Sequence, residues 1–188
     1  MAANGNLKMG LGVLWVGESM ALENAVVGVC RLAADAEAVV DELRQEGIDP
    51  DCISVVTADG QSGLMPVAYY SDGGRLRSTA AQGSSRNLWE ALPGCAVVVN
   101  PGDPPVLLAG SFAASVVRTL DNEALFGDLG PIAGGFYSLG ISRDAARDYE
   151  LSALQGRTLV VVHGRARDVE RARRIVAAQF EGKGQPNP

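Results

Sequence analysis

Two segments near opposite ends of the chain have the pattern of a β-strand joined to an amphipathic helix. Residues 25–57 predict a strand, a helix and a second strand, and residues 157–180 predict a strand followed by a helix. Residues 60–140 between them are rich in Gly and Pro and match neither pattern. This arrangement predicts a sheet with helices packed on it, and it brings together no reactive side chains by itself.

The first segment predicts a β-α-β unit. Val26–Cys30 is a Val-rich strand, and the helix predicted over Ala33–Glu46 is followed by Gly47, which supplies a left-handed C-cap. Ile53–Thr57 is the second strand. The apolar residues of the helix recur at i, i+3, i+4 and i+7, which places them on one face: Ala36, Val39, Val40 and Leu43. Such a unit packs its helix on one face of a sheet.

The other elements follow from the same rules. Ser142 is a good N-cap for a helix that extends to Gln155, and Thr158–His163 is the clearest strand of the chain. The last helix is predicted over Asp168–Phe180, with Val169, Ala172, Val176 and Phe180 buried. Further predictions are strands at Leu11–Val16, Leu64–Tyr70 and Ala96–Asn100, an apolar segment at Val106–Ala109, one helical turn at Leu88–Leu92, and a loop at Ser71–Ser85. A short helix capped by Ser111 is predicted to extend to Leu120. The glycines of Gly127–Gly140 form a hinge or a ligand-approach loop or, as we favour, allow close backbone packing or turns with positive φ.

The composition indicates a single domain over residues 1–188, with residues 60–140 as an elaborated middle segment. The hydrophobic share of 47% and the charged share of 20% are ordinary for a soluble globular chain. A net charge of −6 disfavours a protein that binds the phosphate backbone of nucleic acids. No apolar run approaches the roughly 20 residues that cross a bilayer. The polar ends, residues 1–8 and 181–188, are expected to be disordered.

The three cysteines, Cys30, Cys52 and Cys95, are an odd number without the spacing of a disulfide framework or a thiolate zinc site. They favour a reducing compartment, so we expect a cytoplasmic protein. The first strand is followed by Cys30-Arg31-Leu32-Ala33 and not by a glycine-rich phosphate loop, which argues against a dinucleotide-binding fold. We therefore predict no cofactor and no metal.

Three short motifs occur in order in the last part of the chain. Leu139-Gly140-Ile141 precedes a helix that contains Tyr149-Glu150, and the strand Gly156–His163 ends in Val-His. Together with the first β-α-β unit, these motifs resemble the bacterial general stress and heat-induced stress protein family over about Ala25–Phe180. The resemblance implies a ferredoxin-like α+β domain and a link to stress response. The family brings no established catalytic residues, so none is carried over.

The chain differs from that family in two places. Its middle is less repetitive in Ala and Gly, with the segment VVVNPGDPP inserted, and no clear strand follows the last helix. One edge of the predicted sheet is therefore unfilled. Leu11–Val16, Ala96–Asn100 or a second subunit are the three candidates for that edge.

His163 is the only histidine of the chain and lies at the end of the clearest strand. Its functional interpretations are a proton shuttle or a lone axial ligand to haem, because a site with several histidines is excluded. The alternative, which we favour, is a strand-end histidine bonded to backbone or water.

A cluster of arginines follows His163. Arg167, Arg171 and Arg174 share a helix face at i, i+4 and i+7, and Arg165 lies just before them. Guanidinium groups suit carboxylates and phosphates, so the cluster is a candidate site for an anion or an acidic partner. The alternative, which we favour, is a solvated face that pairs with Asp168, Glu170 or the acidic first helix.

These observations lead to one fold and three functions. We predict an α+β domain with a ferredoxin-like split β-α-β core and an elaborated Gly/Pro-rich middle segment, with all helices on one sheet face. The other face is apolar and needs a cover, so we expect a homo-oligomer, in the first place a dimer. The favoured function is a non-enzymatic, stress-associated protein that binds a small molecule at a subunit interface. The alternatives are an enzyme or haem protein using His163, and an assembly protein that recruits a partner through an open sheet edge.

Overall fold

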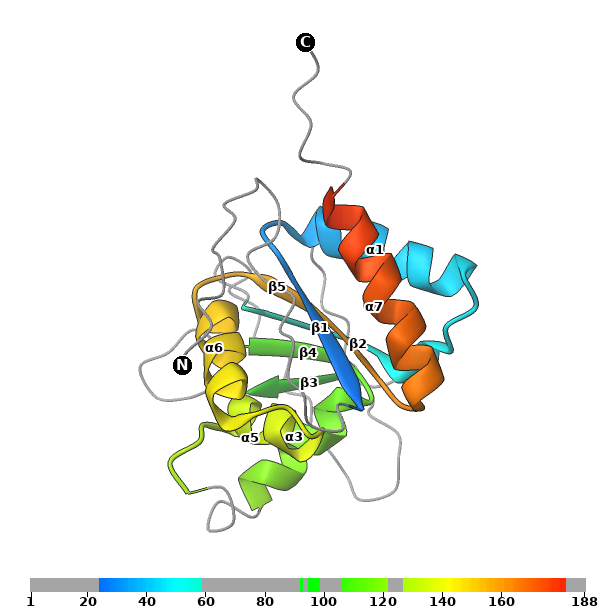
Figure 1. The fold of residues 1–188 in the computed structure, drawn as a ribbon. Helices are drawn as coiled ribbons and strands as arrows, with labels where there is room; N and C mark the ends of the chain where they lie inside the picture. Colours follow the sequence, from blue (N-terminus) through cyan, green and yellow to red (C-terminus); the bar gives the residue numbers. More distant parts are fainter. Residues whose placement is uncertain (1–23, 59–91, 93–94, 99–105, 122–126, 182–188) are drawn as a thin grey trace, which may run out of the picture.

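A five-stranded antiparallel sheet lies at the centre of the protein (Figure 1). The structure, a computed structural model, describes residues 24–58, 92, 95–98, 106–121 and 127–181. The strands are β1 (Ala25–Cys30), β2 (Ile53–Ala58), β3 (Cys95–Val98), β4 (Val106–Gly110) and β5 (Thr158–His163). The helices are α1 (Ala33–Gln45), α3 (Phe112–Asp121), α5 (Pro131–Ser138), α6 (Arg143–Leu154) and α7 (Ala166–Glu181), with a 3₁₀ turn, η1, at Pro50–Cys52. In the part of the chain so described, no helix is both long and apolar enough to cross a membrane.

The order of the strands in the sheet is β1-β5-β2-β4-β3, and every neighbouring pair is antiparallel. Strands β1 and β2 both run opposite to β5, so they are parallel to each other and β5 separates them. Strand β2 separates β4 from β5 in the same way. The sheet therefore contains two split crossovers, which confirms the α+β class. A ferredoxin-like core is not confirmed by this arrangement.

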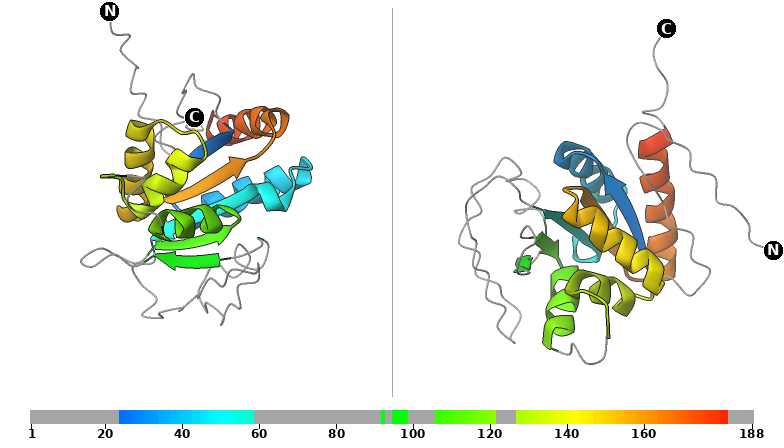
Figure 2. Two further views of the ribbon diagram at one scale, coloured as in Figure 1. Left: turned by 90° about the horizontal axis from the view of Figure 1, so that it is seen from below. Right: turned by 90° about the vertical axis from the view of Figure 1, so that its left-hand side faces the viewer.

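Helices cover both faces of the sheet. Side chains alternate along β5, so Leu159 and Val161 pack among α3, α5 and α6, whereas Val160 and Val162 pack among α1 and α7. Figures 1 and 2 show α1 and α7 on one side of the sheet and α3, α5 and α6 on the other. The protein is thus a three-layer sandwich.

This layering corrects the prediction that all helices lie on one sheet face. The second sheet face is apolar and is covered, as predicted. The cover consists of helices of the same chain, α3, α5 and α6, and not of a second subunit. The bare apolar face that motivated a dimer is therefore absent from the described part of the structure, and the dimer remains a prediction without that support.

The glycine-rich segment before α6 allows helices to pack closely. A Cβ atom on Gly135 would lie 2.7 Å from Val116 Cγ2, because α5 crosses α3 at this point. The rings of Phe112 and Phe136 stack beside it with centroids 4.6 Å apart, and Tyr149 of α6 lies 5.3 Å from Phe136. The close-packing interpretation of these glycines is confirmed at Gly135.

Several predicted elements coincide with the structure. Residues Ala36, Val39, Val40 and Leu43 of α1 are buried, as their spacing predicted. β3 pairs with β4 at one edge of the sheet, so the segment predicted at Ala96–Asn100 does fill an edge. α7 begins at Ala166 and ends at Glu181, slightly longer than predicted. The predictions for residues 1–8, 11–16, 64–70, 71–85, 88–91 and 182–188 lie outside the described residues, as does the side chain of Phe180.

Candidate functional site

An open cleft lies where β5 ends, beside the turn that joins α5 to α6. Its volume is about 810 Å³, within the usual range for sites that take small organic molecules. The lining residues are Asn24, Tyr137, Ser138, Leu139, Gly140, Ile141, Ser142, His163 and Gly164. Among these described lining residues none is a Lys, Arg, Asp or Glu, so they carry no formal charge when His163 is neutral.

The turn that forms one wall of the cleft has the hydrogen bonds of a Schellman motif. Gly140 has a φ of +87°, its amide donates to Tyr137 O (3.0 Å), and the Ile141 amide donates to Phe136 O (3.3 Å). Ser142 then caps α6, because its hydroxyl accepts from the Ala145 amide. The Leu139-Gly140-Ile141 motif therefore sets the corner between two helices.

Glu150 holds the other end of α5. One carboxylate oxygen, Oε1, accepts hydrogen bonds from the amides of Ile132 (3.1 Å) and Ala133 (3.2 Å) in the first turn of that helix. A carboxylate in this place satisfies two amides that have no partner within the helix. Gly130 is needed there, since a Cβ would lie 2.4 Å from the carboxylate. The Tyr149-Glu150 pair thus has structural roles, as an aromatic contact and a helix cap.

His163 is half-buried at the end of β5 and belongs to the face covered by α3, α5 and α6. Its Nε2 lies 2.9 Å from Ser111 Oγ, and Ser111 Oγ lies 2.6 Å from the carbonyl oxygen of Asp51. Ser111 stands between β4 and α3, where Gly110 has a φ of +94° and no room for a Cβ. The favoured interpretation expected backbone or water as the partner of His163, and the structure gives it a side-chain hydroxyl.

Burial lowers the pKa of the His163 imidazole below its usual range near 6.5, so the ring is neutral at pH 7. The Ser111 hydroxyl has one proton, and a carbonyl oxygen such as that of Asp51 can only accept. The hydroxyl therefore donates to Asp51, and Ser111 Oγ accepts from His163 Nε2–H. In this arrangement the histidine does not withdraw the proton of Ser111, so the pair is not an activated nucleophile.

Cys52 lies close to the residue that follows His163. A Cβ on Gly164 would be 3.1 Å from Cys52 Sγ. The pKa of the Cys52 thiol is raised by burial and by the carboxylates of Asp49, Asp168 and Asp51, against a smaller lowering by Arg165. The thiol therefore stays protonated at neutral pH, which is unlike a reactive thiolate. Over the described residues, no group of His, Cys, Asp and Glu side chains is placed to hold a metal ion.

The arginines predicted as an anion site lie apart from the cleft lining. Arg167, Arg171 and Arg174 belong to α7, which packs on the opposite face of the sheet from the His163 side chain. Arg171 bonds to the Glu46 carbonyl and to its carboxylate (3.3 Å), and Arg167 lies 3.4 Å from Asp168. Arg165 is in the turn between β5 and α7. The ion pairs agree with the interpretation of a solvated, self-paired surface, and the anion site remains a prediction.

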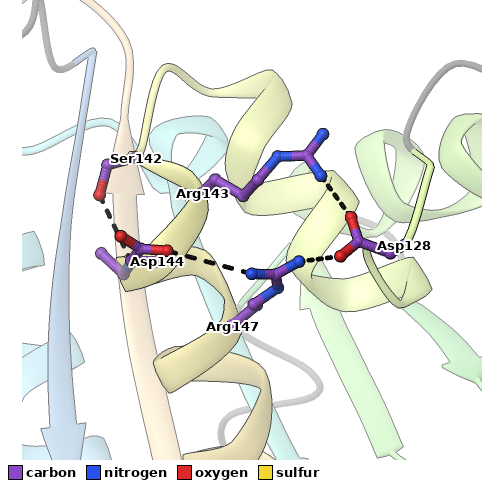
Figure 3. A network of polar contacts seen from close by, with 6 residues as sticks. Asp128, Ser142, Arg143, Asp144 and Arg147 are labelled. Atoms are coloured by element: carbon purple, nitrogen blue, oxygen red, sulfur yellow. Dashed lines mark hydrogen bonds and ion pairs between the residues drawn. The ribbon is translucent and has the colours of Figure 1, made fainter.

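A charged network borders the cleft and was not predicted from the sequence (Figure 3). Asp128 pairs with both Arg143 and Arg147 of α6, and Arg147 lies 4.0 Å from Asp144. The Arg143 guanidinium lies 5.6 Å from the ring centroid of Tyr137, whose side chain lines the cleft. Two arginines and two aspartates balance one another, so the network adds no net charge to this rim.

Comparison with known proteins found no protein-family model, no curated protein and no solved structure that matches the chain.

Proposed function

We propose that the protein binds a small, uncharged organic molecule in the cleft beside His163. The observation that supports the proposal most is the uncharged lining of a cleft of about 810 Å³, with one exposed aromatic ring and one neutral imidazole in it. Tyr137 is 45% exposed, and the part of its ring that Arg143 does not cover offers an apolar surface on which a ligand ring can stack. Leu139 adds an aliphatic contact, and His163 adds a polar group that orients a ligand.

The proposal keeps the favoured function and changes where the molecule binds. A stress-associated role and a ferredoxin-like relationship are supported by the resemblance to the general stress family alone, and a cytoplasmic location is supported by the cysteine pattern alone. A second subunit that closes the open cleft would reconcile a dimer with this site, and light scattering of the purified protein tests it. An enzyme or haem protein using His163 is the alternative, and visible absorption of the purified protein distinguishes it.

Phenol is a suitable first probe, because it is small, uncharged at neutral pH and aromatic. Phenol is titrated into the ¹⁵N-labelled protein, and the amide signals are followed by NMR. The expected result is saturable shifts at Tyr137, Leu139, Gly140 and Gly164. Shifts that are absent, or that concentrate on α1 or α7, would contradict the proposal.

Two tryptophan variants provide a matched comparison. Asn24→Trp places a large ring in the cleft, at an exposed residue whose recorded hydrogen bond uses only its backbone carbonyl. Ala38→Trp places the same ring on the exposed side of α1, on the other face of the sheet. Phenol binding is expected to be lost in Asn24→Trp and kept in Ala38→Trp.

A further inference from the structure

We infer that the cleft selects ligands that donate a hydrogen bond, because the contact with Ser111 fixes His163 as the Nε2–H tautomer and leaves Nδ1 as an acceptor. The ligand class is therefore alcohols, phenols and N–H heterocycles or amides, in preference to ethers and esters of the same shape. This inference rests on the proposed function and specifies the chemistry of that same site.

The Ser111 hydroxyl has one proton and two neighbours with which it forms hydrogen bonds. The Asp51 carbonyl lies 2.6 Å from Ser111 Oγ and has no proton to give, so it takes the single hydroxyl proton of Ser111. The contact of 2.9 Å between Ser111 Oγ and His163 Nε2 must then use a proton on Nε2. A neutral imidazole with its proton on Nε2 has a lone pair on Nδ1.

Nδ1 is the imidazole nitrogen of His163 that does not contact Ser111. In the described part of the chain, no fully buried side-chain nitrogen or oxygen lacks a hydrogen-bond partner. Among the described residues, the structure records a hydrogen bond for Nε2 and none for Nδ1. His163 is a lining residue of the cleft, so Nδ1 is the imidazole atom left to accept from a ligand bound there.

The other polar side chains that line the cleft either already form hydrogen bonds or can both donate and accept one. The Ser138 hydroxyl donates to Gly135 O (2.6 Å), and the Ser142 hydroxyl accepts from the Ala145 amide as the cap of α6. The Asn24 amide and the Tyr137 hydroxyl can each donate and accept, so they select neither class. His163 is thus the lining residue whose hydrogen-bonding role toward a ligand is fixed, as an acceptor. Burial alone lowers its pKa, so the acceptor is present at neutral pH.

Phenol and anisole test the inference, because they share a ring and differ in the hydroxyl proton. Each is titrated into the ¹⁵N-labelled wild type and into His163→Phe, and dissociation constants are taken from the shifts of the cleft amides. We expect phenol to bind wild type about 3- to 10-fold more tightly than anisole, as one net hydrogen bond allows. In His163→Phe the two affinities should become equal.

The single imidazole of the chain gives a second measurement that does not depend on the variant folding. Long-range ¹H–¹⁵N spectra of wild type should show a protonated Nε2 and an unprotonated Nδ1, with phenol and not anisole shifting the Nδ1 signal. Equal binding of phenol and anisole in the cleft of wild type would overturn the inference and leave the proposed function standing. A protonated Nδ1 would also overturn it. Failure of both compounds to bind would overturn the proposed function itself.

Discussion

The Ser111 hydroxyl joins three parts of the chain that are distant in sequence, and Ser111→Ala removes it. The hydroxyl bonds to Asp51 O in η1 (2.6 Å) and to His163 Nε2 at the end of β5 (2.9 Å), and it precedes α3. A typical hydrogen bond contributes about 0.5–1.5 kcal/mol net, and both groups are partly open to solvent. We therefore expect Ser111→Ala to lower the free energy of unfolding by about 1–2 kcal/mol, measured by urea denaturation.

Ser152→Ala is the matched control. Its hydroxyl also donates to a carbonyl, Asp148 O (2.8 Å), but that bond is exposed and lies within one turn of α6. The control should change stability by at most about 0.5 kcal/mol, since surface substitutions of this kind rarely do more. The ¹⁵N signals of His163 supply an independent measure, because loss of the Ser111 partner should bring both neutral tautomers into exchange. Equal stability of the two variants together with unchanged imidazole signals would refute the role assigned to Ser111.

Three further predictions concern the supports of the cleft. Gly135→Ala should lower the free energy of unfolding by about 1–2 kcal/mol in urea denaturation, because the steric overlap of its Cβ with Val116 costs more than the higher helix propensity of Ala contributes. An unchanged denaturation midpoint would show that α3 and α5 separate easily. Glu150→Gln should cost about 0.5–1.5 kcal/mol in the same assay, because the charge that caps α5 is lost while an acceptor remains; a gain in stability would contradict the capping role. Burial lowers the pKa of His163 in the folded protein, so unfolding is accompanied by proton uptake at a pH below the unfolded pKa near 6.5. The free energy of unfolding should therefore decrease as the pH falls from about 7 through 6.5. The wild type should therefore lose more stability than His163→Gln between pH 7.5 and pH 5.5, and a larger loss in the variant would have the wrong sign.

Local patterns predicted much of the fold. The buried face of α1 follows directly from helical spacing, and Thr158–His163 follows from a run of β-branched residues, since both signals lie within a few neighbouring residues. The layering could not be predicted in the same way. A continuous Val-rich strand indicates burial on both faces, but it does not tell whether a helix of the same chain or another subunit covers the second face.

Of the residues at the candidate site, the sequence singled out only His163 as a member. His163 was identified because it is the only histidine and ends a strand, whereas Ser111 is distant in sequence and meets it only through the fold. The local signal at Ser111 was a Gly-Ser pair between an apolar segment and a helix, which also describes an ordinary helix cap. The arginines were grouped with His163 because they are adjacent in sequence, but the turn at Gly164 and Arg165 sends α7 to the opposite face of the sheet.

Intermolecular nuclear Overhauser contacts between phenol and the isotope-labelled protein test the binding site most directly. We expect contacts from the phenol ring to the Tyr137 ring and to the side chain of Leu139, because both residues line the cleft. The same contacts should disappear in Asn24→Trp and persist in Ala38→Trp. Contacts confined to other parts of the molecule, or none at millimolar phenol, would contradict the assignment of the cleft beside His163 as a binding site.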